Sequence, residues 1–354
     1  MWLSALFAGI SVERSRILGI SSKISEEDMI LVHAIQLSPR QSWARLGAIL
    51  GTTPETLERS WRRLRDGGFA WTSAVLNASI TNSGCLAYVG ISCAPDAVEQ
   101  VAQHLGREPE VISIAITSGK YHLFISVATS SFETMSRFLV NRVNQVPGVS
   151  GAHSMLATSL FKSGTQWRLQ SSLSPSQIQA LASEASWPGV PKSISLTPVD
   201  RELRDLLTED GRMSFSQLGR RTGTDRSTAQ RRVERMVRCG LFSIRCDVAG
   251  PDFGWPLSMT LGIDVSPAKL NDVGRKLSTE LDLRVVAGVA DRPNLMISVW
   301  LRSLEEVPKF ETSLLENYPE VEIARRHVNF YSSKRMGRLL TPDGRAVGVV
   351  IPTI

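Results

Sequence analysis

The sequence predicts an α+β fold made of two tandem copies of one arrangement, in which three short helices precede a module of order βαββαβ. Three observations lead to this expectation. The 354-residue chain aligns with itself without a gap when it is shifted by 172 positions. Each copy begins with helix-capping residues and apolar residues at helical spacing. Each then continues with alternating strand-like and helix-like segments.

The repeat covers roughly residues 24–158 and 196–330 and brings identical residues together along its whole length. One matched glycine pair could arise by chance, but several at a common offset indicate a duplication. The matched glycines are Gly47 with Gly219, Gly51 with Gly223, Gly68 with Gly240, and Gly90 with Gly262.

The copies and the segments around them define seven parts of the chain. They are a lead-in at residues 1–23, a helix-turn-helix domain at 24–72, a ferredoxin-like domain at 80–160, a linker at 161–195, a second helix-turn-helix domain at 196–245, a second ferredoxin-like domain at 253–332 and a tail at 333–354. The apolar opening "MWLSALFAGI" is too short to span a bilayer, so we expect no membrane association.

Capping residues place the three helices of each copy. Ser25 and Thr197 are each followed three residues later by an aspartate, which is the pattern of a capping box at the start of a first helix. Ser42 and Ser214 are expected to cap short second helices. The third helices start at Thr53, before Pro54, and at Asp225. Helical spacing predicts that each third helix buries one apolar face, lined by Leu57, Trp61 and Leu64 or by Ala229, Val233 and Met236.

After each set of helices, the spacing of the apolar residues changes from one typical of helices to one typical of strands. The segments "CLAYVGIS" and "LSMTLGIDV" are typical of strands, and each is followed by an amphipathic helix, a pair of strands, a second helix and a last strand. This order predicts a ferredoxin-like unit with two helices covering one face of an antiparallel sheet. The other face of each sheet has to be buried as well, because an exposed apolar face would be an interaction surface.

Composition limits the classes of function. Lys and Arg number 40 against 34 Asp and Glu, and the four cysteines form no C-x-x-C pair. We therefore expect reduced thiols in a cytoplasmic protein, with no metal site and no cofactor. The excess charge is concentrated near the third helices, where residues 40–71 hold six Arg against three acids and residues 212–243 hold eight Arg against two.

Such a concentration of arginine indicates binding to the phosphates of double-stranded DNA, and Arg and Gln side chains also suit base recognition. An ordinary solvated helix face is the alternative interpretation, which the repetition of the pattern disfavours. The residues expected to contact DNA are Thr56, Arg59, Arg62, Arg63, Arg226, Ser227, Thr228, Gln230, Arg231 and Arg235. Since acidic residues lie near the first set, the third helix of the second copy is expected to bind DNA more strongly than that of the first copy.

The segment "DRELRDLLTEDGRMSFSQLGRRTGTDRSTAQRRVERMVRCGLF", from Asp200 to Phe242, and the βαββαβ module after it resemble the Lrp/AsnC (feast/famine) transcriptional regulators of bacteria. The resemblance implies a sequence-specific DNA-binding regulator of bacterial origin, here in tandem double-length form. It further implies that the ferredoxin-like (RAM-type) domains dimerise and bind an amino acid or another small effector. The chain would then be an intramolecular pseudo-dimer that forms homo-oligomers, with recognition helices about 34 Å apart.

The same resemblance directs attention to the turn between the second and third strands of each module. The residues there that we expect to bind an effector are Ser118, Gly119, Lys120, Tyr121, Asp291 and Arg292. Lys120 and Arg292 align at the repeat offset and would suit an anionic ligand. The alternative is that both segments are ordinary surface turns.

Two further functions remain as alternatives. Some tandem proteins built on the same modules are siroheme decarboxylases, and the candidate residues for such an enzyme are His153, His327, Arg325 and Arg326. His153 and His327 do not align at the repeat offset, and no set of catalytic side chains is evident, so we expect no enzymatic activity. A ligand-sensing or assembly protein whose helices no longer bind DNA is the other alternative.

Overall fold

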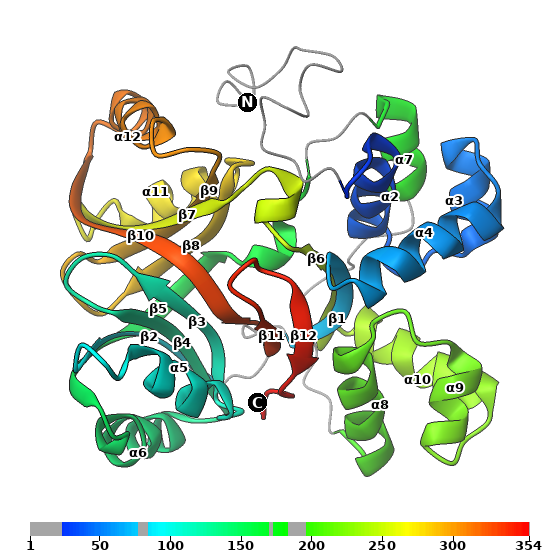
Figure 1. Cartoon of the computed structure of the whole chain (residues 1–354), viewed down its shortest axis with the longest axis horizontal. Coiled ribbons are helices and arrows are strands. Elements are labelled where there is room, and N and C mark those ends of the chain that lie inside the picture. The colour runs from blue at the N-terminus through cyan, green and yellow to red at the C-terminus, as the bar shows by residue number, and fades with distance from the viewer. Residues whose placement is uncertain (1–22, 77–83, 170–172, 183–195, 354) are drawn as a thin grey trace. The chain divides into compact units, whose positions relative to one another are not determined.

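The structure, a computed structural model, describes residues 23–76, 84–169, 173–182 and 196–353, and these form two compact units (Figure 1). The helical unit contains the described parts of residues 24–82 and 168–249. The sheet unit contains Lys23 and the described parts of residues 83–167 and 250–354. Each unit therefore combines one segment from each copy of the repeat. The expected lead-in at 1–23 lies outside the described residues except for Lys23.

The helical unit consists of two sets of three helices, each followed by a strand. The first set is α2 (Glu26–Leu37), α3 (Trp43–Leu50), α4 (Pro54–Asp66) and β1 (Ala70–Leu76). The second set is α8 (Pro198–Glu209), α9 (Phe215–Arg221), α10 (Arg226–Arg238) and β6 (Phe242–Val248). One more helix, α7 (Pro175–Ala182), comes from the segment between the copies.

The helices begin where the capping residues predicted. Ser25 and Asp28 form a reciprocal capping box at α2, and Thr197 and Asp200 form one at α8. The side chains of Thr53 and Asp225 accept hydrogen bonds from backbone amides at the starts of α4 and α10. The six apolar residues predicted to face the core from these two helices are all buried, which confirms the expected orientation of both.

A two-stranded antiparallel ribbon joins the two sets of helices. Strand β1 pairs with β6 from Ala70 opposite Val248 to Leu76 opposite Phe242. Ser73 lies opposite Arg245, which is its own counterpart at the 172-residue offset. The ribbon is therefore symmetric about this pair, so the two copies approach each other in equivalent ways.

The sheet unit contains both βαββαβ modules in the predicted order. The first module is β2 (Cys85–Cys93), α5 (Val98–Gly106), β3 (Val111–Thr117), β4 (Leu123–Thr129), α6 (Phe132–Asn141) and β5 (Val149–Lys162). The second is β7 (Leu257–Val265), α11 (Leu270–Ser278), β8 (Leu283–Val289), β9 (Leu295–Leu301), α12 (Glu306–Asn317) and β10 (Val321–Arg335). Short 3₁₀ segments lie at Val143–Gln145, Gly164–Gln166 and Pro251–Phe253.

The two modules are joined by their strands. Strand β5 of the first module pairs with β8 of the second, and β10 of the second pairs with β3 of the first. Ala157 lies opposite Val289, and the equivalent residues Asn329 and Thr117 are also paired. Because β10 additionally pairs with β7, the eight strands close on themselves.

Each module has its own apolar core between the strands and its two helices, and a third apolar cluster joins the modules on the opposite faces of the strands. Tyr88, Phe124 and Met155 of the first module are buried there with Ala287, Val289 and Met296 of the second. The faces that the helices leave uncovered are thus buried against each other, as the sequence requires.

Some boundaries differ from those expected. Strands β1 and β6 continue beyond 72 and 245, and β5 runs into the expected linker as far as Lys162. The tail at 333–354 is not a plain extension, because β10 enters it and β11 (Arg338–Leu340) and β12 (Ala346–Val349) extend the sheet from β10. Within the described ranges, no helix is long and apolar enough to span a membrane.

Candidate functional site

The exposed faces of α4 and α10 carry the predicted DNA-contacting residues. Arg59, Arg62 and Arg63 are exposed on α4, where Thr56 is partly buried. On α10, Arg226, Ser227, Arg231 and Arg235 are exposed, and Thr228 and Gln230 are partly buried. The buried apolar face of each helix fixes which side chains face solvent, so both helices present a row of basic groups.

Several of these side chains already have partners inside the chain. Arg63 binds both carboxylate oxygens of Asp28 at 2.5 Å. Arg235 binds Asp200 at 3.0 Å, where Arg232 binds as well. Burial opposes ionisation of Asp200, but hydrogen bonds from Thr197 and Arg232 outweigh it and lower its pKa. Each first helix thus holds an arginine of the third helix through its capping aspartate.

Other predicted contacts are also engaged locally. Asp225 accepts hydrogen bonds from Ser227 and Thr228, which lower its pKa. Gln230 donates to Glu234 at 2.8 Å, and Arg62 binds Glu58 at 3.3 Å. Among the described residues, the side chains of Arg59, Arg226 and Arg231 have no such partner. These three are therefore the side chains best prepared to bind an external group.

Sequence reasoning missed the arginines that hold the two sets of helices together. Arg40 donates to the carbonyls of Gly211 and Met213 at 2.6 and 3.0 Å. Arg212, its counterpart at the repeat offset, donates to the carbonyls of Pro39 and Gln41 at 2.7 and 2.9 Å. We call Arg40 and Arg212 the arginine clamp.

Aromatic rings complete the clamp. The guanidinium of Arg40 lies 4.3 Å from the ring centre of Phe215, and that of Arg212 lies 3.9 Å from the ring centre of Trp43. Trp43 and Phe215 are also 172 residues apart. Burial lowers the pKa of each arginine to about 10, so both stay cationic at neutral pH. The clamp and the β1–β6 ribbon fix how α4 and α10 are oriented to each other within the helical unit.

The sheet unit contains a polar cluster where the two modules meet. His153 on β5 binds Asp291 at 2.7 Å, and Arg325 on β10 lies 3.6 Å from the same carboxylate. The ring of Tyr121 stacks on His153 and lies against His327, with centroid distances of 6.0 and 5.6 Å. We call Tyr121, His153, Asp291, Arg325 and His327 the inter-module cluster.

The cross-pairing of strands explains why residues so far apart meet. Asp291 follows β8, which pairs with β5 and so approaches His153. Tyr121 precedes β4, and its turn is bonded to β10 through the amide of Ser118 and the carbonyl of Val328. The ring of Tyr121 lies so close to Gly90 that a Cβ atom there would be 2.3 Å from it. Glycine at position 90 therefore leaves the space that the tyrosine occupies.

The remaining candidates for an effector site lie around this cluster. Ser118 accepts a hydrogen bond from the amide of Val328, and Gly119 adopts the left-handed conformation in the turn. The ammonium group of Lys120 lies 5.6 Å from the ring centre of Tyr121. Arg292 is highly exposed and binds Asp264 at 3.2 Å. Arg326, a candidate for the enzyme alternative, binds Glu311 at 2.6 Å and is not part of the cluster.

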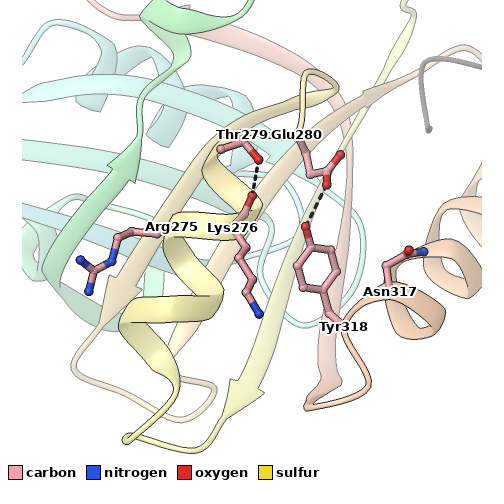
Figure 2. Close-up of a pocket in the computed structure, with 6 residues that line it drawn as sticks. All are labelled: Arg275, Lys276, Thr279, Glu280, Asn317 and Tyr318. Atoms are coloured by element: carbon pink, nitrogen blue, oxygen red, sulfur yellow. Dashed lines mark hydrogen bonds between the residues drawn. The ribbon is translucent and has the colours of Figure 1, made fainter. Parts of the chain in front are cut away.

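A separate shallow pocket of about 510 Å³ lies between the ends of α11 and α12 (Figure 2). It is lined by Arg275, Lys276, Thr279, Glu280, Asn317 and Tyr318. The hydroxyl of Tyr318 donates to Glu280 at 2.8 Å, as Figure 2 shows. The two most buried polar groups of the pocket thus satisfy each other, which makes it a weaker candidate than the inter-module cluster.

Comparisons with protein families give two matches. Residues 86–167 match the Lrp/AsnC ligand binding domain, and residues 196–237 match the AsnC-type helix-turn-helix domain. The first match falls on the βαββαβ module of the first copy, and the second falls on α8 to α10 of the second copy.

Curated relatives include archaeal regulators. An uncharacterized HTH-type transcriptional regulator of Pyrococcus abyssi is 30% identical over 132 residues, which are 37% of this chain and 82% of the relative. The HTH-type transcriptional regulator FL11 of Pyrococcus horikoshii is 23% identical over 144 residues, covering 40% of this chain and 95% of the relative. These relatives give no support to the expected bacterial origin. Each has about the length of one copy of the repeat.

Among solved structures, the siroheme decarboxylase NirDL resembles this chain with a TM-score of 0.57 and 12% sequence identity. The likeness covers 88% of this chain and 93% of NirDL. At this level of identity it establishes similarity of fold alone. The structure of Escherichia coli AsnC covers 38% of this chain at 21% identity, with a TM-score of 0.34.

Proposed function

Because this chain belongs to the Lrp/AsnC family of HTH-type transcriptional regulators, we propose that it recognises DNA with α4 and α10 together, as a tandem double-length member of the family. The observation that carries the proposal is the pair of exposed arginine-bearing helices, held in equivalent positions by the arginine clamp and the β1–β6 ribbon. One chain would then read two half-sites, as a dimer of shorter regulators does.

The two half-sites would be read unequally. Arg226 and Arg231 on α10 are exposed and have no partner among the described side chains, whereas Arg59 on α4 directly follows Glu58 and lies four residues after Glu55. Acidic neighbours reduce the attraction of a helix for phosphates. We therefore propose that α10 supplies most of the base recognition and that the preferred operator is an imperfect palindrome.

The βαββαβ modules would bind a small effector and hold the two copies together. The family match to a ligand-binding domain supports this role, and the inter-module cluster is the place in the sheet unit best suited to it. Residues Ser118, Gly119, Lys120, Tyr121, Asp291 and Arg292 remain the proposed surroundings of the effector. An amino acid is one such effector, and catalysis is not part of this proposal.

Footprinting of the purified protein on the DNA upstream of its own gene tests the proposal. We expect two protected half-sites and a binding constant that falls by about a thousandfold between about 50 and 200 mM salt, because phosphate contacts release counterions. Binding that is insensitive to salt, or protection of one half-site alone, would contradict the two-helix proposal. The variant Arg231→Ala should bind the same DNA more weakly than the wild type.

A second candidate function, an enzyme resembling siroheme decarboxylases, is favoured by one observation. His153, His327 and Arg325, which were predicted for that enzyme, meet in the inter-module cluster. Titration of the protein with siroheme, followed by its absorbance spectrum, tests this candidate. A spectral change together with loss of a carboxyl group from the tetrapyrrole would support the enzyme, and an unchanged spectrum would exclude it.

A further inference from the structure

Three polar atoms of the inter-module cluster are buried and lack a hydrogen-bond partner among the described protein atoms. They are the hydroxyl oxygen of Tyr121, Nη1 of Arg325 and Nδ1 of His327. The Tyr121 and His327 residues are only 3% and 6% exposed. Buried polar groups in folded proteins are almost always hydrogen-bonded to protein, water or a ligand. Three such atoms in one cluster therefore indicate a place that a polar molecule occupies.

The cluster has a buried floor and a rim that solvent reaches. Tyr121 and His327 form the floor, with their rings 5.6 Å apart. The side chains of His153, Arg325 and Asp291 are 39%, 31% and 19% exposed. The cluster thus combines two buried rings with three polar side chains that solvent partly reaches.

The groups that lack partners are suited to a hydrogen-bond acceptor. The guanidinium of Arg325 only donates, the Tyr121 hydroxyl can donate, and a neutral imidazole donates from one ring nitrogen. Burial lowers the pKa of His327, the backbone of Ser118 opposes this change, and the charge of Arg325 lowers the pKa further, which favours the neutral ring. A carboxylate offers about four acceptor positions and forms charge-assisted bonds with arginine.

The carboxylate of the inter-module cluster, Asp291, already has a hydrogen-bond partner within the chain. Asp291 binds His153 at 2.7 Å, and this bond helps to hold the pKa of Asp291 below its usual value against the opposing effect of burial. No second carboxylate belongs to the cluster, so the described side chains offer little to an ammonium group. Nη1 of Arg325 lies 3.6 Å from Oδ2 of Asp291, which is an ion-pair contact too long for a hydrogen bond, so this atom still lacks a hydrogen-bond partner among the described protein atoms.

We propose that the inter-module cluster binds one small carboxylate per chain, with the ligand oxygens accepting hydrogen bonds from Arg325 Nη1 and the Tyr121 hydroxyl beside His327. This proposal deepens the effector role proposed above and rests on it. It assigns the binding to residues from both copies of the repeat. In this proposal, the side chains of Lys120 and Arg292 do not bind the ligand directly.

The repeat explains why there is one site and not two. At the 172-residue offset, Tyr121 corresponds to Pro293 and His327 corresponds to Met155. Neither Pro293 nor Met155 can donate a hydrogen bond from its side chain. Arg325 corresponds to His153, which already binds Asp291, so the mirrored position lacks the donors of Tyr121 and His327, and the expected stoichiometry is one carboxylate per chain.

The test compares propionate, propionamide and L-alanine by calorimetric titration of the full chain without DNA. Propionate and propionamide have nearly the same shape, and only propionate carries a carboxylate. We expect propionate to bind with a stoichiometry of one and propionamide not to bind. Because no DNA is present, failure of this test leaves the DNA-binding proposal intact, and failure of DNA binding leaves this test valid.

Variants identify the site. Tyr121→Phe removes only a hydroxyl and is expected to weaken propionate binding about tenfold, and Arg325→Gln is expected to weaken it further. Tyr318→Phe, which removes a hydroxyl elsewhere in the sheet unit, is the matched control and should bind like the wild type. Equal binding of propionate and propionamide, binding of L-alanine without propionate, no binding of either acid, or wild-type binding by both site variants would each overturn the proposal.

Discussion

Lys162 and Lys334 are counterparts at the repeat offset, and each buries its ammonium group against the end of the first helix of the other βαββαβ module. Lys334 donates at 2.9 Å to the carbonyls of Gly106, the last residue of α5, and of Glu108, just after it. Lys162 donates to the carbonyl of Glu280, just after α11. Lys162 is 4% exposed and Lys334 is 1% exposed. Each module therefore satisfies carbonyl groups that the helix of the other module leaves open.

Replacement of Lys334 by methionine should destabilise the sheet unit by about 1–3 kcal/mol, because two buried carbonyls lose their donor and methionine offers none. Thermal unfolding followed by circular dichroism measures the effect. Lys309→Met, on the exposed side of α12, is the matched control. Unfolding of the Lys334→Met protein at the temperature of the wild type would show that these bonds contribute nothing to stability.

The arginine clamp leads to a prediction about DNA. In the double variant Arg40→Met and Arg212→Met, the four hydrogen bonds to the turns of the opposite copy are lost. The two recognition helices should then be held less rigidly, so binding to an operator with both half-sites should weaken about tenfold. Binding to DNA with one half-site should change little. Gel-shift titrations on the two DNAs measure both effects.

The exposed Arg107→Met variant, in the sheet unit, is the control for the clamp experiment. The helix content of the double variant is checked by circular dichroism before the titrations. An equal loss of affinity on both DNAs would mean that the clamp supports the fold of each helical set and does not position one set against the other.

The inequality of α4 and α10 is tested with one arginine from each. Arg231→Ala should weaken specific binding by about 1–3 kcal/mol if Arg231 reads a base. Arg59→Ala should have a smaller effect that is similar on specific and random DNA, as expected for a phosphate contact. Competition titrations with operator and random DNA separate the two kinds of contact. A larger loss of specific binding for Arg59→Ala than for Arg231→Ala would reverse the proposed order of the two helices.

Much of this fold could be predicted from the sequence because its signals are local. The capping boxes at Ser25 and Thr197 fix where helices begin, and apolar spacing fixes which face of α4 and α10 is buried. Because the copies align at an offset of 172 residues, a helix or strand predicted in one copy is also predicted at the equivalent residues of the other. None of these inferences needs knowledge of which residues meet across the fold.

The parts that were missed depend on contacts between the copies. Arg40 and Arg212 align with each other in sequence, but nothing in that alignment shows that each reaches the opposite turn. His153 and His327 do not align, which counted against their acting together. The structure brings both into one cluster because β5 pairs with β8 and β10 pairs with β3. Strand pairing over such separations is a tertiary property that local patterns leave open.

His33 predicts how the helical unit responds to acid. It is buried in α2 at 7% exposure, and burial, together with the nearby charge of Arg168, lowers its pKa to about 4. An unfolded histidine has a pKa of about 6.5, so between about pH 6.5 and pH 4 the unfolded chain binds more protons than the folded one. Stability from this group is present above pH 6.5 and is lost as the pH falls towards 4.

The loss should amount to about 3 kcal/mol across that window, since each pKa unit corresponds to about 1.4 kcal/mol. Urea unfolding at pH 7 and pH 5, observed by hydrogen exchange in α2, measures the part of this loss that falls above pH 5, which is about 2 kcal/mol. The variant His33→Gln has no titrating imidazole there and should lose less stability between the two pH values than the wild type. His104→Gln, at an exposed position in the sheet unit, is the control. The same decrease in His33→Gln as in the wild type would assign the acid sensitivity of α2 to other groups.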